Sequence, residues 1–278
     1  MAIFDNHFHL RPTGLGVGAA KVFEKAGGTA LMLTHSPYDD IPIRSAEDYE
    51  AAYARTLGLG RRVREATRVK VFVALGPYPV DLIPLTKSLG LPAAADVLKR
   101  GVDLAGRHVA NGDAVAIGEV GRPHFPVDAD VWRASNEVLA HAMTVARDRE
   151  CSVILHTEDP TPQTFQEFAT MADRYHLARQ KVVKHHSSPL TRPEENGGIV
   201  PSILAKSELV KAAVGGGPFF LETDYIDDPK RPGAVLGPAT VPRKTKIWIA
   251  QGLLPENIAQ QIHADLPRRT YGIETETE

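Results

Sequence analysis

The chain has 278 residues, of which 43% are hydrophobic and 24% charged, and these proportions exclude a disordered or low-complexity protein. Its 32 basic and 34 acidic residues give a net charge of −2, which excludes a strongly basic protein with an extended duplex-binding surface. The single cysteine, Cys151, cannot form an internal disulfide, and the N-terminus lacks a secretory signal, so we expect a cytoplasmic protein. No membrane span is predicted, because charged residues interrupt the most apolar long region, 199–221.

Short apolar runs rich in β-branched residues recur along the chain, separated by longer segments with helical spacing. Seven such runs predict buried parallel strands at 2–8, 29–34, 69–75, 114–119, 152–156, 181–185 and 219–223. Residues 198–204 form a weaker eighth run, since Pro201 interrupts it. This alternation fits either an open doubly wound sheet or a closed TIM-type (β/α)8 barrel, and we favour the barrel.

The segments between the strands predict helices and loops. Helical spacing is clearest at 130–149, where Asp128 or Asp130 can cap the first turn. No Pro- or Gly-rich linker divides the chain, so residues 1–278 are expected to form a single barrel domain. Two C-terminal helices are predicted at 243–251 and 255–266, a frayed acidic tail at 274–278, and long loops that could cover a site at 35–45, after Ser187 and at 227–242.

Ionisable residues follow the predicted strands at the point where each strand ends. His7 and His9 are two residues apart in the first strand, so both imidazoles point to the same face, which suits chelation of one metal ion. The carboxyl ends of the strands in a parallel barrel converge on one mouth, so residues far apart in sequence become neighbours there. The other strand-end candidates are Glu119, His156, His185 or His186, and Asp224.

Five short motifs occur in order along the chain: DNHFHL at 5–10, IGEVG at 117–121, LHTE at 155–158, VKHH at 183–186 and LETDY at 221–225. In order and separation they resemble the TatD-related metal-dependent hydrolases of the amidohydrolase superfamily, and GRPHFP after Glu119 is most similar to an archaeal-type branch. The resemblance implies a TIM-type barrel that binds one or two divalent metal ions, with Glu119 placed to bridge them. It assigns the metal-ligand positions to His7, His9, Glu119, His156, His185 and Asp224.

The chain departs from the family pattern after the bridging glutamate. Family members that degrade DNA usually carry an acidic residue there in a Gly-Leu-Asp context, where this chain has Arg122, Pro123 and His124. The pair His185 and His186 also needs a choice, since adjacent strand residues face opposite ways and only one should enter the mouth. The family motif selects His185.

Imidazole and carboxylate ligands without thiolates suit zinc, which we favour, with manganese, iron, nickel or magnesium as alternatives. Two such ions about 3.5 to 4 Å apart would lower the pKa of a shared water. Asp224 would orient the resulting hydroxide and accept its proton. Glu119 and Asp224 are therefore the expected catalytic residues.

Residues around the expected mouth are candidates for substrate binding: His35, Arg122, His124, Glu158, Lys230, Arg231 and Arg243. Their basic members favour an anionic substrate, either a small molecule or a nucleic-acid end, because barrels often hold phosphate at this position. For the last three, a solvated loop or salt bridges to Asp227 and Asp228 are an equal alternative.

These features predict a divalent-metal-dependent hydrolase that uses an activated water. The expected substrate is a phosphodiester, as for a TatD-like deoxyribonuclease, or another anionic ester. One alternative is an amidohydrolase or lactonase that cleaves a C–N or carboxylic ester bond, since the same chemistry attacks carbonyl carbon. A non-catalytic metal-binding barrel is the last alternative.

Overall fold

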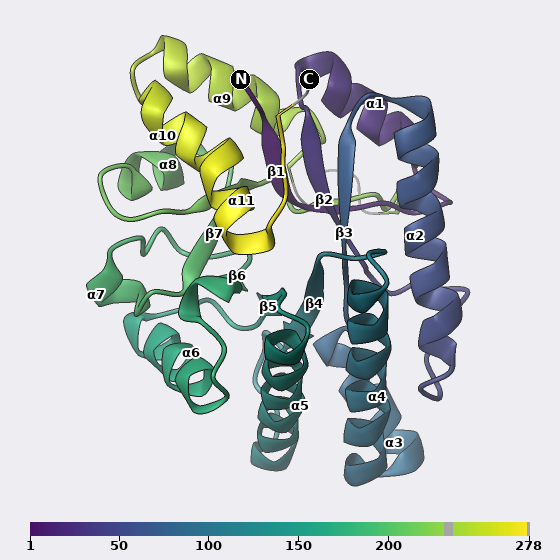
Figure 1. Cartoon of the computed structure of the whole chain (residues 1–278). Helices are drawn as coiled ribbons and strands as arrows, with labels where there is room; N and C mark the ends of the chain where they lie inside the picture. The colour runs from purple at the N-terminus through teal and green to yellow at the C-terminus, as the bar shows by residue number, and fades with distance from the viewer. Residues whose placement is uncertain (231–235, 277–278) are drawn as a thin grey trace.

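The computed structural model describes residues 1–230 and 236–276, and these form a barrel of parallel strands surrounded by helices (Figure 1). The strands are β1 (Phe4–His9), β2 (Ala30–Thr34), β3 (Lys70–Leu75), β4 (Ala116–Gly121), β5 (Ser152–His156), β6 (Val182–Lys184), β7 (Val200–Leu204), β8 (Phe220–Glu222) and β9 (Tyr225–Ile226). They pair in the order β8-β7-β6-β5-β4-β3-β2-β1-β9. The two edges of this sheet meet, because β8 pairs with β7 while β9, two residues further on, pairs with β1. The predicted TIM-type barrel is confirmed, including the run that Pro201 interrupts.

Helices follow the strands on the outside of the barrel (Figure 1). They are α1 (Val17–Ala26), α2 (Asp48–Ala66), α3 (Leu82–Leu89), α4 (Leu91–Ala110), α5 (Ala129–Asp148), α6 (Pro162–Arg174), α7 (Pro193–Asn196), α8 (Ser207–Ala213), α9 (Thr240–Ala250), α10 (Glu256–Gln260) and α11 (Leu266–Tyr271). Helices α5, α9 and α10 confirm the three that the sequence predicted, and a π-helical turn at Gln261–Asp265 carries α10 on into α11. Within residues 1–230 and 236–276, no helix has the length and apolarity to cross a membrane.

An irregularity in β1 places its two histidines inside the barrel. Phe4 points inward and packs in the interior core with Met32 and Phe220. Strict alternation would turn Phe8 to the same side. The register against β2 shifts between Asp5 and Phe8, and Phe8 instead packs outside, in the core that includes Phe23 of α1, with ring centroids 6.1 Å apart.

The C-terminal segment closes the end of the barrel where the strands begin. The Tyr271 hydroxyl donates to Asn6 Oδ1 at 2.9 Å, and Ser152, the first residue of β5, donates to the carbonyl of Thr270 at 2.6 Å. The tail differs from the predicted frayed end, because Thr275 is buried and donates to the carbonyl of His263 at 2.5 Å. Thr277 and Glu278 lie outside the described residues.

His263 is fully buried between β1 and the C-terminal helices, and it should make stability depend on pH. The backbone N–H of Phe4 donates to its Nδ1 at 3.0 Å, and burial lowers its pKa from 6.5 to about 4. Below pH 6.5 His263 binds a proton in the unfolded chain but stays neutral in the folded chain. The free energy of unfolding therefore falls as the pH drops from 6.5 toward 4. At about 1.4 kcal/mol per pKa unit, the full loss approaches roughly 3 kcal/mol.

We therefore expect His263→Gln to be less stable than the wild type at pH 8 but to lose less stability on acidification. Urea unfolding of both metal-free proteins at pH 8, 6.5 and 5 measures the difference. An equal pH slope in the two proteins would show that His263 does not contribute.

Candidate active site

The carboxylate of Glu119, in β4, lies among imidazoles that come from three other parts of the barrel. Its Oε1 is 2.8 Å from His7 Nε2, 3.0 Å from His185 Nε2 and 3.5 Å from His156 Nδ1. His7 belongs to β1, His156 ends β5 and His185 directly follows β6. The convergence of strand ends on one mouth brings these distant residues together.

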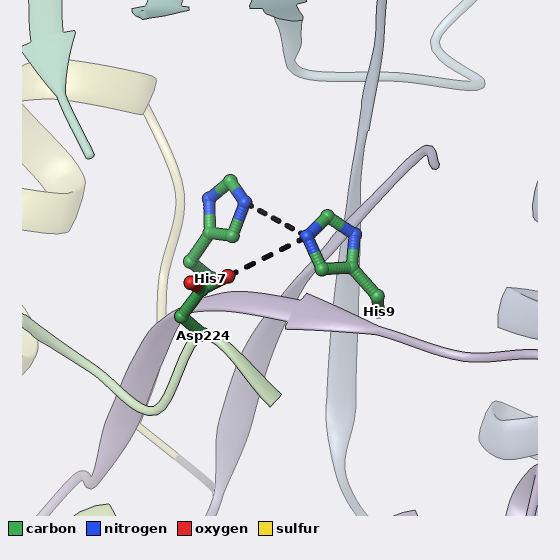
Figure 2. Close-up of side chains that lie close together, drawn as sticks. All are labelled: His7, His9 and Asp224. Atoms are coloured by element: carbon green, nitrogen blue, oxygen red, sulfur yellow. Dashed lines mark hydrogen bonds and ion pairs between the residues drawn. The ribbon is translucent and has the colours of Figure 1, made fainter. Parts of the chain in front are cut away.

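The predicted ligand residues form two groups that meet at Glu119. In the first, His9 Nε2 is 3.1 Å from His7 Nε2 and 3.7 Å from Asp224 Oδ1 (Figure 2). The second group is Glu119, His156 and His185, and in each group the ligand atoms lie within 4.8 Å of one another. One carboxylate oxygen therefore contacts both groups, which is an arrangement able to bridge two cations.

The hydrogen bonding of His9 prepares it to hold a cation. Its Nδ1 lies 2.9 Å from the backbone carbonyl oxygen of Thr34, which can only accept, so His9 carries its proton on Nδ1. Its Nε2 therefore presents a lone pair toward His7 and Asp224. Electron pairs that face one another in a buried site call for a positive charge between them, and imidazoles with carboxylates suit zinc and related divalent ions. These residues fit a divalent metal ion.

The surroundings hold Glu119, Asp224 and His185 in the protonation states that bind metal. His7 differs, because burial is outweighed by the Glu119 carboxylate, which raises the pKa of His7 to about 9, so a bound ion would have to displace that proton. Burial raises the pKa of Glu119, but the interactions with His185 and His156 outweigh it and keep that pKa well below its usual range. Burial also opposes ionisation of Asp224, yet the hydrogen bond from His186 and the nearby imidazoles lower its pKa strongly. Burial lowers the pKa of His185 to about 4, which keeps this imidazole neutral.

Glu222, at the end of β8, is a site residue that the sequence reasoning missed. It is fully buried, its Oε1 is 3.4 Å from His185 Nδ1, and the same oxygen accepts the backbone N–H of His186 at 2.7 Å. A carboxylate behind a ligating histidine fixes the orientation of the ring. The signal was present in the motif, because Glu222 and Asp224 are two residues apart and a strand would turn both toward the same face.

His185 and His186 both lie at the mouth, in different places. Strand β6 ends at Lys184, so the alternation used to choose between them no longer applies. His186 adopts a positive φ of 47°, and its side chain is 48% exposed with Nδ1 3.0 Å from Asp224 Oδ2. His185 is buried against Glu119. His186 contacts Asp224 Oδ2, whereas His9 faces the other oxygen of that carboxylate, Oδ1.

A cavity of about 510 Å³ opens over the ligand cluster and includes one of the predicted substrate-binding residues. His124 lines it, with Nδ1 2.9 Å from His156 Nε2. Tyr78, Arg11 and Asp39 also line it and were not predicted, and the ring of Tyr78 lies edge-on to His156 at 5.0 Å. Arg11 directly follows the first histidine motif, so its position in the sequence was an available signal.

Arg122 and Glu158 do not line this cavity, because they bind each other beside α5 and α6. The Arg122 guanidinium pairs with the Glu158 carboxylate through two nitrogens and lies 4.2 Å from the centre of the Trp132 ring. Its side chain is only 2% exposed. His35 is also buried outside the cavity, with Nδ1 2.8 Å from the hydroxyl of Thr56.

The remaining candidates lie further from the ligand cluster. Lys230 is exposed, 3.3 Å from Asp39 Oδ2, and Arg243 is exposed on α9 and does not line the cavity. Arg231 lies outside the described residues. Asp227, considered as a salt-bridge partner, instead accepts backbone N–H groups of Leu15 and Gly16, each at 2.7 Å.

Because Arg122 is paired with Glu158, we expect its replacement to affect the stability of the protein and not substrate binding. Arg122→Leu should lower the free energy of unfolding by about 3 kcal/mol, because it leaves acidic partners without their cation. The kcat/KM of the protein that remains folded should change little. Thermal unfolding and kinetics below the transition check this, with exposed Arg133→Leu on α5 as the control. A large loss of kcat/KM at unchanged stability would instead place Arg122 in substrate binding.

Comparison with known proteins supports the same fold. The family model described as TatD related DNase matches residues 4–272. The chain is 38% identical to the uncharacterized protein MJ1127 of Methanocaldococcus jannaschii, over 99% of this chain and 98% of the relative. Among solved structures, the TatD homolog YjjV of Escherichia coli has a TM-score of 0.68 at 19% identity, with 98% of each chain covered. The phosphotriesterase homology protein of Escherichia coli, complexed with phosphate in its active site, has a TM-score of 0.60 at 11% identity, covering 97% of this chain and 98% of that one.

Proposed function

This chain belongs to the TatD-related DNase family of hydrolases, and from its cluster of histidines and carboxylates we propose that it hydrolyses phosphodiester bonds in nucleic-acid ends or small anionic molecules. The observation that carries the proposal is the position of Glu119, whose Oε1 faces His7 in one ligand group and His185 in the other. A protein that only bound metal for structure would use closed ligand sets. Here the ligands open into a cavity large enough for a substrate.

We assign the metal-holding role to the six strand-end residues and favour zinc as the ion. Bound there, one or two divalent ions would polarise the phosphoryl oxygen and acidify a water molecule. The residues that would hold them are His7, His9, Glu119, His156, His185 and Asp224.

The chain's own residues would then position the water and the substrate. Asp224 reaches the cavity with one oxygen toward His9 and the other toward His186, so it can accept the proton that the attacking water releases. His186 holds that carboxylate in place. His124 and Tyr78 lie beside His156 and line the same cavity, so they can contact the leaving portion of an ester.

One structural neighbour is consistent with phosphorus as the atom attacked. The phosphotriesterase homology protein shares this barrel and has phosphate in its active site. Amide and lactone hydrolysis remain the alternative outcome, because the same ligand set serves both reactions.

A substrate panel tests the proposal. The protein is stripped with a chelator, reloaded with zinc or manganese, and offered a single-stranded oligonucleotide, bis(p-nitrophenyl) phosphate, a lactone and a cyclic amide. We expect metal-dependent hydrolysis of the phosphodiesters. Turnover confined to the lactone or the amide would overturn the proposal in favour of carbonyl chemistry.

We also propose that the protein works in the cytoplasm. Cys151 is unpaired and buried, and burial raises the pKa of its thiol to about 11, so it has no disulfide to require an oxidising compartment. Fractionation of cells expressing a tagged chain tests the location, and recovery outside the cytoplasmic fraction would contradict it.

A further inference from the structure

A second cavity, of about 810 Å³, adjoins the cavity over the metal ligands. Arg11 and Asp39 line both, so the two cavities are neighbours. Helix α2 forms one wall, with residues at spacings of three and four that share one helix face. These wall residues are Arg55, Gly58, Arg61, Arg62 and Glu65. The proposed chemistry at the metal ligands uses none of them.

Basic side chains exceed acidic ones in this cavity. The basic lining residues are Arg11, Arg55, Arg61, Arg62 and Lys230, and the acidic ones are Asp39, Asp40, Glu65 and Asp228. Arg55 pairs with Asp40 at 2.5 Å, and Asp39 is shared between Arg11 and Lys230. Within the described part of the chain, Arg61 and Arg62 have no ion pair. Arg61 and Arg62, on α2, are therefore the cations of this cavity without an ion pair in that part of the chain, and Glu65 lies on the same helix face.

Arg11 lies at the junction of the two cavities, which it lines together with Asp39, and one of its N–H donors has no partner among the described residues. Asp227 accepts the backbone N–H of Arg11 at 3.2 Å and those of Leu15 and Gly16, which fixes the loop after β1. The Arg11 Nε is buried and has no hydrogen-bond partner among residues 1–230 and 236–276. The ion pair of the Arg11 guanidinium with Asp39 joins Nη1 to Oδ1 at 3.6 Å, which is longer than a hydrogen bond. A buried donor left unpaired is costly, so the Arg11 guanidinium at the junction has hydrogen-bonding capacity that the described residues leave unused.

Gly58 keeps the α2 wall open between the arginines. A Cβ at this position would meet only Arg61 Nη2, at 3.7 Å, which is ordinary contact. A larger side chain there would therefore extend into the cavity without a clash at its base, and replacing a helical glycine does not weaken the helix.

We propose that this second cavity binds the phosphate next to the one being cleaved, so that the substrate is an oligonucleotide end with at least two phosphates. The inference rests on the proposed function, because it takes the metal-ligand cavity as the site of the scissile phosphate. Arg61 and Arg62 recognise the neighbouring phosphate through charge-assisted hydrogen bonds, and Arg11 lies between the two phosphates. An isolated phosphodiester gains nothing from the second cavity.

Two changes test the second cavity in different ways. Arg61→Ala/Arg62→Ala removes its unpaired charge, and Gly58→Leu fills it. The matched control is Arg107→Ala/Arg269→Ala, which removes two exposed arginines that line neither cavity. Each zinc- or manganese-loaded protein is assayed for hydrolysis of 5′-phosphorylated tetrathymidylate and of bis(p-nitrophenyl) phosphate, and for binding of the tetranucleotide by fluorescence anisotropy.

We expect both test variants to lose about 10- to 100-fold in kcat/KM and in affinity for the tetranucleotide, mostly through KM, while bis(p-nitrophenyl) phosphate hydrolysis stays within about twofold. The control should match the wild type on both substrates. Wild-type affinity for the tetranucleotide in both variants, or equal losses on both substrates, would overturn the second phosphate site. If the wild type binds the tetranucleotide through Arg61 and Arg62 but hydrolyses neither substrate, the proposed function fails and the binding site stands. If it neither binds nor hydrolyses the tetranucleotide, both fail.

Discussion

Asp224→Asn is expected to lower kcat by about 10²- to 10⁴-fold while KM changes much less. Asn has nearly the same shape as Asp and can keep a contact to His186, so the fold and much of the metal should remain. Asn cannot accept the proton of the attacking water. Because this proton transfer takes place in the transition state and not in substrate binding, its loss lowers kcat. Steady-state kinetics on the substrate that the panel identifies measures the effect.

The metal content of Asp224→Asn must be measured in the same samples. If the variant retains its metal but loses kcat, the role of Asp224 in proton transfer is separated from its role as a metal ligand. A kcat near that of the wild type would reduce Asp224 to a ligand, and His124 would become the base to test, since Glu158 is already paired with Arg122.

The second large effect is expected from His185→Ala. This side chain is buried, and its Nε2 lies 3.0 Å from Glu119, so its loss removes a ligand from the group that also contains His156. We expect a loss of metal affinity larger than the roughly 10- to 100-fold that follows removal of a residue that only orients a ligand.

His186→Ala is the matched control for that variant. The neighbouring imidazole is half exposed and pairs with Asp224, so its loss should cost less than about tenfold in metal affinity. Competitive titration with a metal-sensitive dye compares the two variants. A larger loss in His186→Ala would reverse the assignment of the ligand.

The barrel could be predicted because its strands are buried on both faces and therefore appear as short apolar runs between helices. The resemblance to TatD-related hydrolases is confirmed, and it too came from residues at the strand ends. The shift in β1 that turns Phe8 outward could not be predicted, since it depends on packing against Phe23 of α1.

The part of the site that could be predicted is the part that the strands themselves position. His7 and Glu119 belong to strands and Asp224 lies in the short link between β8 and β9, so the fold determines where they lie. Arg122 and His35 come just after strands as well, but helices supply partners for both: Glu167 on α6 for Arg122, in addition to Glu158, and Thr56 on α2 for His35. Proximity in sequence to a strand end does not reveal such competing partners.

The central claim is that Glu119 joins two groups of ligands around divalent ions, and metal analysis of the purified chain tests it most directly. Elemental analysis after titration with zinc should give two ions per chain, and Glu119→Gln should reduce both occupancies, because its Oε1 contacts both groups. A chain that retains no divalent ion and gains no hydrolytic activity when ions are supplied would contradict the claim, as would full occupancy in Glu119→Gln.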